Sequence, residues 1–395
     1  MAQRATGKRA RIAGRRETGR RGLWRGLGAA ALVSASLAVA ACAPAGAGDE
    51  ESRGSITWGS WPYYIDYDAE TDTIPSLEMF TEETGIEVEY LEDIDGNLSF
   101  YARIKDALAL DQHIGYDVFV PNDWLINRMV SEGSVQRLDR SAMPNVEANM
   151  LDLLRDSKFD PGREYSAPYL GFMTGLAWNT EKVPGGVSTL DDLLDPKLKG
   201  KVGVLSEMRE TMGIIMLGHG VDISGDWGDA EFYESLDWLQ RALDSGQITQ
   251  VKGNSYTQDL ENETTWVQLC WSGDIALLND EYGEDKWAFA IPETGATMSF
   301  GSFVVPNGTE KVALVQELID FYYRPDIAAR VATSSYMISP VRDVREEAAK
   351  IAPEVAENTM IFPTDEMLAN LREMRQLTPE EDNRYSQAFA QALGL

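Results

Sequence analysis

The sequence predicts an α/β protein whose sheets are mostly parallel and whose chain forms two domains. Short apolar segments with strand character alternate with segments of helical periodicity along the chain, and this alternation is typical of βαβ units. About 350 residues follow a distinctive N-terminal leader, a length that corresponds to two domains of ordinary size. No internal repeat interrupts the pattern.

The first 41 residues have the features of an export signal. They contain nine lysines and arginines and a single acid, Glu17, and an apolar run from residue 26 to residue 41 follows the basic part. A basic region, a short apolar region and small residues at its end are typical of such signals, and the run is too short for a typical membrane span. Arg20 and Arg21 also resemble a twin-arginine export motif.

Cys42 directly follows small and apolar residues, Val39, Ala40 and Ala41. This arrangement resembles the bacterial lipobox, in which the cysteine becomes the lipidated N-terminus, whereas an ordinary cleavage site beside a chance cysteine is the alternative. We predict that Cys42 is lipidated and that the small, polar residues 42–54 form a tether. Cys270 is the only other cysteine, so it would have no disulfide partner.

Glycine and proline residues indicate where the expected helices and strands end, and serine and threonine residues indicate where helices begin. The predicted elements are strand 56–58, helix 73–84, strand 86–90, strand 116–120, helix 124–131, strand 201–205, strand 303–306, helix 310–323 and a last helix that ends at Gly394. We expect Ser206, Thr309 and Thr378 to cap the helices that follow them.

The net charge of −29 excludes one class of partner. A surface this acidic repels phosphate backbones, so we expect no binding to nucleic acid. It favours cationic ligands only weakly, because charge spread over a surface is screened beyond about 8–10 Å. Solubility or a saline environment accounts for the total charge equally well, so the total charge does not identify a ligand.

Predicted βα loops carry aromatic and carboxylate side chains where ligands bind in α/β sheets. Aromatic faces attract cations by roughly 0.5–2 kcal/mol, and carboxylates add charge-assisted hydrogen bonds. Together these groups predict a box for an organic amine, although any single ring more often packs its loop onto the domain. The residues, loop by loop, are Trp61 and Tyr64, then Asn122 and Trp124, then Glu207 and Glu210.

Short motifs spread over the chain, most clearly from 56 to 336, carry a family resemblance. They are WPYY at 61–64, FTEETGIEV at 80–88, YDVFVP at 116–121, FDPG at 159–162, YSAPY at 165–169, DPKLKGK at 195–201, RE at 209–210, WSGD at 271–274 and RPD at 324–326. In order and spacing they resemble the periplasmic spermidine/putrescine-binding proteins of ABC importers.

This resemblance implies a two-lobed periplasmic-binding-protein fold, in which crossing strands hinge two lobes that close over a linear polyamine. The first lobe would comprise 55–168 and 302–344, and the second 169–301 and 345–395. A monomeric receptor, not an enzyme, is implied, with no cofactor and no metal. It would capture spermidine, putrescine or a related amine and deliver it to the permease and ATPase of an importer. We expect it in the periplasm or on the outer face of the cell membrane, anchored through Cys42.

The resemblance also implies a set of ligand-binding residues by motif position. In order, they correspond to two first-lobe aromatics against the methylene chain, a small polar residue and an aromatic, an acidic pair, and two further aromatics. These positions are Trp61, Tyr64, Asn122, Trp124, Glu207, Glu210, Trp271 and Tyr336.

One departure from the family concerns the strand that enters the first lobe. Where the family has Trp-x-Asp, this chain reads Ser299-Phe300-Gly301, so the aspartate that holds an amine and the tryptophan that lines the box are both missing. Either another acid such as Asp259 or Asp274 replaces the aspartate, or the ligand has one cationic end and a different second end. The roomier, more polar end left by Ser299 favours the second interpretation.

Two alternatives stay open. The first is the same class of receptor with another cargo, which would be another organic cation, an amino compound with one acidic group, or ferric iron. Against iron, Tyr336 lacks the adjacent tyrosine that is usual in iron sites. The second is a secreted lipoprotein enzyme such as a glycosidase that uses Glu207 and Glu210. Against it, acids are favoured near a helix N-terminus in any case. His113 and His219 also lack metal-ligand spacing, and no nucleophile elbow is present.

Overall fold

The computed structural model describes residues 52–94 and 96–394, so the predicted export signal and Cys42 lie outside the described residues. The strands are β1 (Gly54–Gly59), β2 (Ile86–Leu91), β3 (Val118–Phe119), β4 (Ser166–Asn179), β5 (Val202–Leu205), β6 (Ile248–Lys252), β7 (Val267–Trp271), β8 (Trp287–Ala290), β9 (Ala296–Val304) and β10 (Leu371–Arg372).

The α-helices of the described part of the chain alternate with these strands and then dominate its last quarter. They are α2 (Pro75–Thr84), α3 (Asn97–Leu108), α4 (Asp123–Ser131), α5 (Pro144–Asn149), α6 (Met208–Gly218), α7 (Asp229–Asp244), α8 (Tyr256–Glu261), α9 (Ser272–Tyr282), α10 (Val312–Tyr322), α11 (Pro325–Ser335), α12 (Val344–Ile351), α13 (Pro353–Ala356), α14 (Asp365–Ala369) and α15 (Pro379–Leu393).

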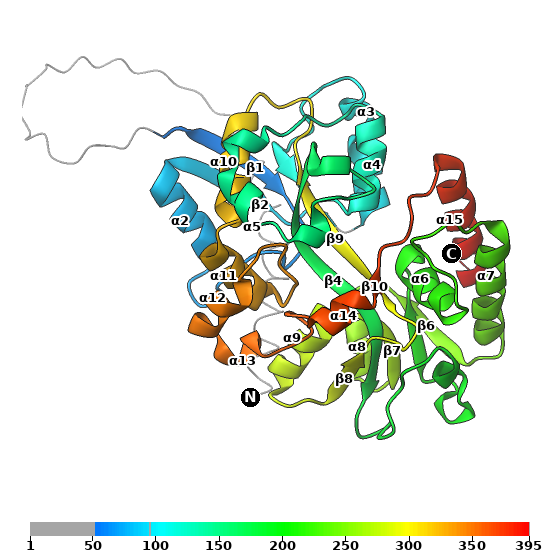
Figure 1. Cartoon of the computed structure of the whole chain (residues 1–395). Helices are drawn as coiled ribbons and strands as arrows, with labels where there is room; N and C mark the ends of the chain where they lie inside the picture. Colours follow the sequence, from blue (N-terminus) through cyan, green and yellow to red (C-terminus); the bar gives the residue numbers. More distant parts are fainter. Residues whose placement is uncertain (1–51, 95, 395) are drawn as a thin grey trace, which may run out of the picture.

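The sheet has two halves joined by long strands, and Figure 1 shows a group of helices and strands on either side of β4 and β9. The strand order is β2-β1-β3-β9-β4-β7-β5-β6, with β10 beside β9 and β8 beside β4. β1 runs parallel to β2 and β3, and β5 runs parallel to β6 and β7. β4 and β9 are antiparallel to each other. The predicted α/β fold is confirmed, and antiparallel pairing is confined to the crossing strands and their neighbours.

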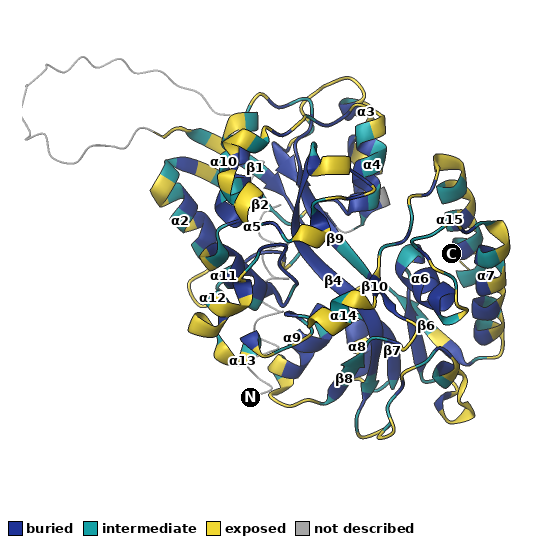
Figure 2. Ribbon diagram, viewed as in Figure 1, coloured by how far each residue is buried: buried dark blue, intermediate teal, exposed yellow. Residues whose placement is uncertain are grey.

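The core of the first lobe is a group of rings around Trp58, which is fully buried. Its ring centroid lies 4.9 Å from that of Tyr90, 5.3 Å from Tyr169 and 5.2 Å from Tyr322. These rings come from β1, β2, β4 and α10. The crossing strand β4 therefore contributes a ring to the core of the first lobe. Figure 2 shows that the long central strands are mostly buried and that exposed residues lie on the helices and loops at the outside of the molecule.

The predicted start of the last helix is confirmed. The Thr378 hydroxyl accepts a hydrogen bond from the N–H of Glu381 at 3.2 Å, and the Glu381 carboxylate accepts from the N–H of Thr378 at 2.9 Å. This reciprocal capping box satisfies two amide groups that the helix itself leaves unpaired. Gly394 follows α15 in the left-handed conformation, with φ of 74°, as the sequence indicated.

Two other predicted caps are wrong. Glu207, not Ser206, occupies the position before α6, and its side chain forms no capping hydrogen bond. α10 begins at Val312, later than expected, because the hydroxyl of Thr309 donates to the buried carboxylate of Asp117 at 2.5 Å. Thr309 thus ties a loop to the first-lobe sheet.

The last quarter of the chain passes from one lobe to the other. α12 contacts both α11 and α13, beside the helices of the first lobe. β10 then pairs with β9, and α15 packs on α7 in the second lobe. We therefore propose that the chain passes from the first lobe to the second after α13, whereas the sequence predicted this boundary at residue 344. Within the described residues, no helix combines the length and the apolar character that crossing a bilayer requires.

Candidate functional site

A cleft lies where the two lobes and the crossing strands meet. The first turns of α4 and α6, the strand β9 and the segment after β10 all contribute to its lining. Its lining residues are Asp123, Trp124, Phe159, Arg209, Glu210, Thr297, Met298, Ser299, Glu373 and Met374. This is the position that parallel α/β sheets favour for ligands, beyond the carboxyl ends of strands.

The second lobe contributes an acidic pair. α6 starts just after β5, and the hydroxyl of Thr211 fixes the turn by donating to the carbonyl oxygen of Leu205 at 2.7 Å. Glu210 lies in the first turn of α6 with only 8% of its surface exposed. Burial raises the pKa of its carboxyl, and the negative charge of Glu207 raises that pKa further. The Glu207 side chain reaches solvent, yet the protein around it also raises its pKa by partial desolvation.

The Glu210 carboxylate forms neither an ion pair nor a hydrogen bond with another described side chain. A buried carboxylate without a counter-charge is costly, because desolvation disfavours its ionised form. The positive end of the α6 dipole offsets part of this cost. The arrangement is therefore suited to receive a cation.

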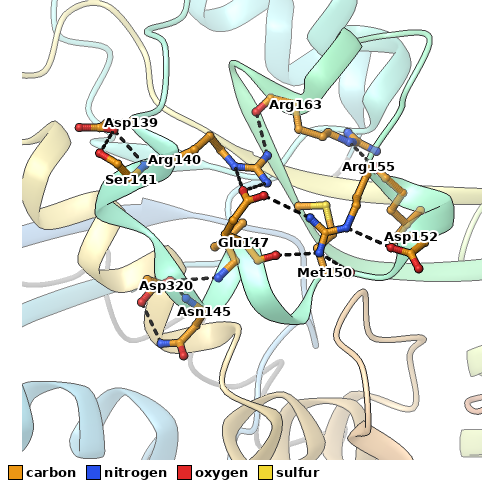
Figure 3. A network of polar contacts seen from close by, with 12 residues as sticks. Asp139, Arg140, Ser141, Asn145, Glu147, Met150, Asp152, Arg155, Arg163 and Asp320 are labelled. Atoms are coloured by element: carbon orange, nitrogen blue, oxygen red, sulfur yellow. Dashed lines mark hydrogen bonds and ion pairs between the residues drawn. The ribbon is translucent and has the colours of Figure 1, made fainter.

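The first lobe contributes Trp124, whose position depends on a buried ion pair. Asp123, the first residue of α4, accepts a hydrogen bond from the Arg163 guanidinium at 2.8 Å, and both side chains are almost fully buried. Figure 3 shows how the chain around Arg163 is held: Glu147 pairs with Arg140 at 2.6 Å and with Arg155 at 3.5 Å, while the carbonyl oxygen of Arg163 accepts from Arg140 at 3.3 Å. These contacts fix the start of α4.

Arg209 crosses the cleft and lies on the face of Trp124. Its guanidinium carbon is 4.1 Å from the ring centroid, and it donates to the carboxylate of Asp382 in α15 at 2.7 Å. The distance is within the range of a cation–π contact. The exposed face of Trp124 thus accepts a cation, and in this structure the cation is one from the protein.

The lobes are in contact across this site. Lys158 donates to the carbonyl oxygen of Ser224 at 2.8 Å, and the amide of Gln376 bonds with that of Asn127. The cleft retains about 30 Å³ of free space, which is room for about two water molecules. A ligand larger than water therefore requires the lobes to separate or Arg209 to move.

The aromatic loop after β1 joins the core more closely than the sequence suggested. The indole N–H of Trp61 donates to the carbonyl oxygen of Val120 at 2.7 Å, and its ring centroid is 6.2 Å from that of Tyr64. Tyr64 is buried, and both burial and the charges of Asp274 and Glu210 raise the pKa of its hydroxyl. Tyr64 therefore lies near the acidic side of the cleft, although neither ring lines the cleft in its present form.

The position of the missing family aspartate is tightly packed. Gly301 bridges to Asn122, which precedes α4. A Cβ atom on Gly301 would lie 2.9 Å from Cγ1 of Val120 and 3.5 Å from Tyr64. A side chain there would point toward the Tyr64 side of the site, but only if Val120 moved.

Trp271 and Tyr336 are placed differently from each other. Trp271 precedes α9, its ring centroid is 5.6 Å from that of Phe172, and its indole N–H is buried without a hydrogen-bond partner among the described residues. Trp271 is not among the residues that line the cleft. Tyr336 directs its hydroxyl to Asp280, farther along α9, and burial together with this carboxylate raises its pKa. The structure does not bring the Tyr336 hydroxyl to the cleft with Glu210.

The two acids suggested as replacements for the missing aspartate already have partners. Asp259 forms an ion pair with Lys252 at 2.7 Å, and Asp274 accepts a hydrogen bond from the hydroxyl of Tyr256 at 2.7 Å. Sequence reasoning missed Glu373, which lines the cleft together with Glu210. No periodic pattern could have revealed it, because β10 has only two residues. In the described part of the chain, no cluster of three potential ligand side chains is arranged to hold a metal ion.

Comparison with known proteins identifies the class to which this fold and cleft belong. Residues 76–363 match the family described as bacterial extracellular solute-binding protein. Because the match spans well over half of the chain, the chain belongs to this family, and the predicted family and two-lobed fold are confirmed.

Individual relatives are transport proteins that bind substrates. The spermidine/putrescine-binding periplasmic protein of Escherichia coli K12 is 28% identical over 308 residues, which cover 76% of this chain and 83% of that protein. The putrescine-binding periplasmic protein of the same organism is 25% identical over 348 residues, which cover 84% and 89%. The solved spermidine/putrescine ABC transporter substrate-binding protein of Streptococcus pneumoniae has a TM-score of 0.72 and 23% identity, with 86% of this chain and 98% of that chain covered. This last likeness establishes the shared fold.

Proposed function

We propose that this protein is the substrate-binding receptor of an ABC importer and that it captures a polyamine, spermidine or putrescine, between its two lobes. The observation that carries the proposal is the buried, unpaired carboxylate of Glu210, which shares a cleft between the lobes with the indole face of Trp124. A primary ammonium group supplies a positive charge for the Glu210 carboxylate and a cation for the face of the Trp124 ring. It pairs with the carboxylate, and the adjoining methylene groups pack on aromatic rings.

The relatives support the same cargo, because their names specify spermidine and putrescine. In this proposal Trp61, Tyr64, Asn122, Trp124 and Glu207 surround the ligand together with Glu210 and Trp271. The hydroxyl of Tyr336, which is bonded to Asp280, stays at the periphery unless the lobes rearrange. The protein acts as a carrier, not an enzyme, and hands its ligand to the permease and ATPase of the importer.

Export and anchoring belong to the same proposal. The family is extracellular, and an importer receptor must remain close to its permease. A lipid on Cys42 and the short tether that follows would hold the protein at the outer face of the membrane. A monomer is sufficient for this role, since the cleft is formed within one chain.

A thermal-shift panel on the lipid-free protein tests the proposed cargo. Spermidine or putrescine at about 100 times its Kd should stabilise the fold by roughly 2.7 kcal/mol. Glu210→Gln should abolish most of this shift, whereas Glu234→Gln, an exposed acid on α7 of the same lobe, should retain it. No shift with any amine, together with a shift for a sugar or an anionic ligand, would contradict the proposal.

A further inference from the structure

The charges of the cleft do not balance within the protein. Two of its charged groups are neutralised by neighbours outside the lining: Asp123 by Arg163 at 2.8 Å, and Arg209 by Asp382 at 2.7 Å. Glu210 and Glu373 also line the cleft. Neither forms an ion pair or a hydrogen bond with another described side chain. Two carboxylates therefore line the same cleft, and neither has an ion-pair partner among the described side chains.

Glu373 is held in place by its neighbours in the chain. On one side, β10 pairs with β9 through Leu371 and Arg372. On the other side, the N–H of Arg375 donates to the carbonyl oxygen of Ile223 at 2.8 Å, and its guanidinium donates to the carbonyl oxygen of Trp227 at 2.8 Å. A carboxylate between two such anchors has a fixed position, as a specific ligand contact requires.

The surroundings of Glu373 differ from those of a solvated surface acid. The side chain is only partly exposed, and burial together with the negative charge of Asp123 raises its pKa. Two opposing charges act on Glu373, those of Arg163 and Lys158. Lys158 donates to the carbonyl oxygen of Ser224. Arg163 already donates to Asp123, to Ser166 and to the carbonyl oxygen of Leu154. It therefore has little capacity left to neutralise Glu373.

We infer that Glu373 binds the second ammonium group of the ligand and takes the role of the acid that is missing at Gly301. This inference rests on the proposed function and assigns a further binding residue to it. Glu210 on α6 holds one ammonium group, Glu373 just after β10 holds the other, and Ser299 and Trp124 line the same cleft. A monoamine or a zwitterion would leave one buried carboxylate unpaired.

The same assignment accounts for the missing aspartate at Gly301. The acid is present, but it comes from a segment about seventy positions later that β10 brings alongside β9. Because Ser299 is small, the chain at 373–374 and the ligand can share the space on this side of the strand. Of the two interpretations raised by the sequence, the geometry points to a relocated acid.

Calorimetric titration with three probes of equal carbon length tests the inference. Putrescine, butylamine and γ-aminobutyrate carry two, one and zero net positive charges at pH 8, and a bound ammonium group favours the ionised form of the carboxyl that it contacts. The wild-type protein should prefer putrescine over butylamine by at least about tenfold. Glu373→Gln should weaken putrescine by at least about tenfold, because it leaves one ammonium group unpaired in a desolvated site. The same variant should change butylamine affinity by less than about threefold. The preference for putrescine over butylamine should therefore be lost.

A conservative variant and a matched control sharpen this test. Glu373→Asp retains the charge on a shorter side chain, so it should restore the preference for dications and move the optimum of a linear diamine series to a longer chain. Glu380→Gln removes an exposed acid in the first turn of α15 and should leave every affinity unchanged. Melting curves of the unliganded variants establish that each one is folded.

The outcomes separate this inference from the function on which it rests. If the wild-type protein binds no amine, both the proposed function and the role of Glu373 are refuted. If it binds putrescine tightly and Glu373→Gln leaves that affinity unchanged, or weakens putrescine and butylamine equally, the role of Glu373 is refuted while the receptor function stands.

Discussion

Glu210→Gln should make the unliganded protein more stable and the receptor inactive. The pKa of Glu210 is raised from 4.5 to about 7, chiefly by burial. For an acid, a raised pKa in the folded state means that the fold disfavours the ionised form. The penalty is absent below the unfolded pKa near 4.5, grows as the pH rises toward 7, and is complete at pH 8. At about 1.36 kcal/mol per pKa unit, it amounts to roughly 3 kcal/mol.

Removing the charge removes this penalty. We therefore expect Glu210→Gln to raise the melting temperature of the unliganded protein by roughly 2–6 °C at pH 8, and to change it little at pH 4. The same substitution should weaken spermidine or putrescine by at least about 100-fold, because loss of one partner from a desolvated ion pair costs roughly 3–5 kcal/mol. Melting curves at the two pH values and calorimetry at pH 8 measure both effects.

A gain in stability with a loss of binding distinguishes a site carboxylate from a structural one. A structural Glu210 would lose stability on substitution and leave the affinity of a folded variant intact, and that pair of results would refute the reasoning. The exposed acid Glu234 on α7 supplies the control, since Glu234→Gln should alter neither quantity. Calorimetry of the wild-type protein near pH 6 adds a further check: ligand binding should release a proton from Glu210, so the observed enthalpy should depend on the ionisation enthalpy of the buffer.

Three further predictions follow from the geometry and the sequence. Trp124→Ala should weaken amine binding by roughly 1–3 kcal/mol, through lost cation–π contact, in calorimetry; an unchanged affinity would return Trp124 to a packing role. Gly301→Asp should lower the melting temperature, because its Cβ would lie 2.9 Å from Val120, and should not improve putrescine affinity; a tenfold gain would show that the acid at this position is still missing. Cys42→Ser should move the protein from the cell envelope to the soluble exported fraction, and continued membrane association on fractionation would exclude the lipid anchor.

The fold and half of the site followed from local patterns. Alternating apolar and helical segments predicted the α/β architecture, and the rule that ligands bind after parallel strands selected Trp124 and Glu210, which do line one cleft. Trp124 and Glu210 lie a few residues after the ends of β3 and β5. Their positions could therefore be predicted from the sequence near each strand.

The remainder depends on contacts that no local pattern encodes. Glu373 reaches the cleft only because a two-residue strand pairs with β9. Arg209 was visible as part of a motif, but its contact with Trp124 requires the two lobes to meet. Tyr336 was placed by motif position, whereas its left-handed backbone, with φ of 59°, and its bond to Asp280 direct its hydroxyl elsewhere.

Capture requires the lobes to open and then to close again, since the arrangement described here leaves so little free space in the cleft. A ligand that binds only between closed lobes stabilises that state by its differential affinity. Separation of α4 from α6 would free Trp124 from Arg209, and the incoming ammonium group and methylene chain would then take over the aromatic face.

Calorimetric titration of spermidine and putrescine into the lipid-free wild-type protein is the most direct test of the central claim, that this cleft binds polyamines. The account predicts saturable binding of about one ligand per chain, with a Kd in the micromolar range or below, and no comparable binding of butylamine or γ-aminobutyrate. Saturable binding of a neutral or anionic solute, with no heat of binding for either polyamine, would contradict it.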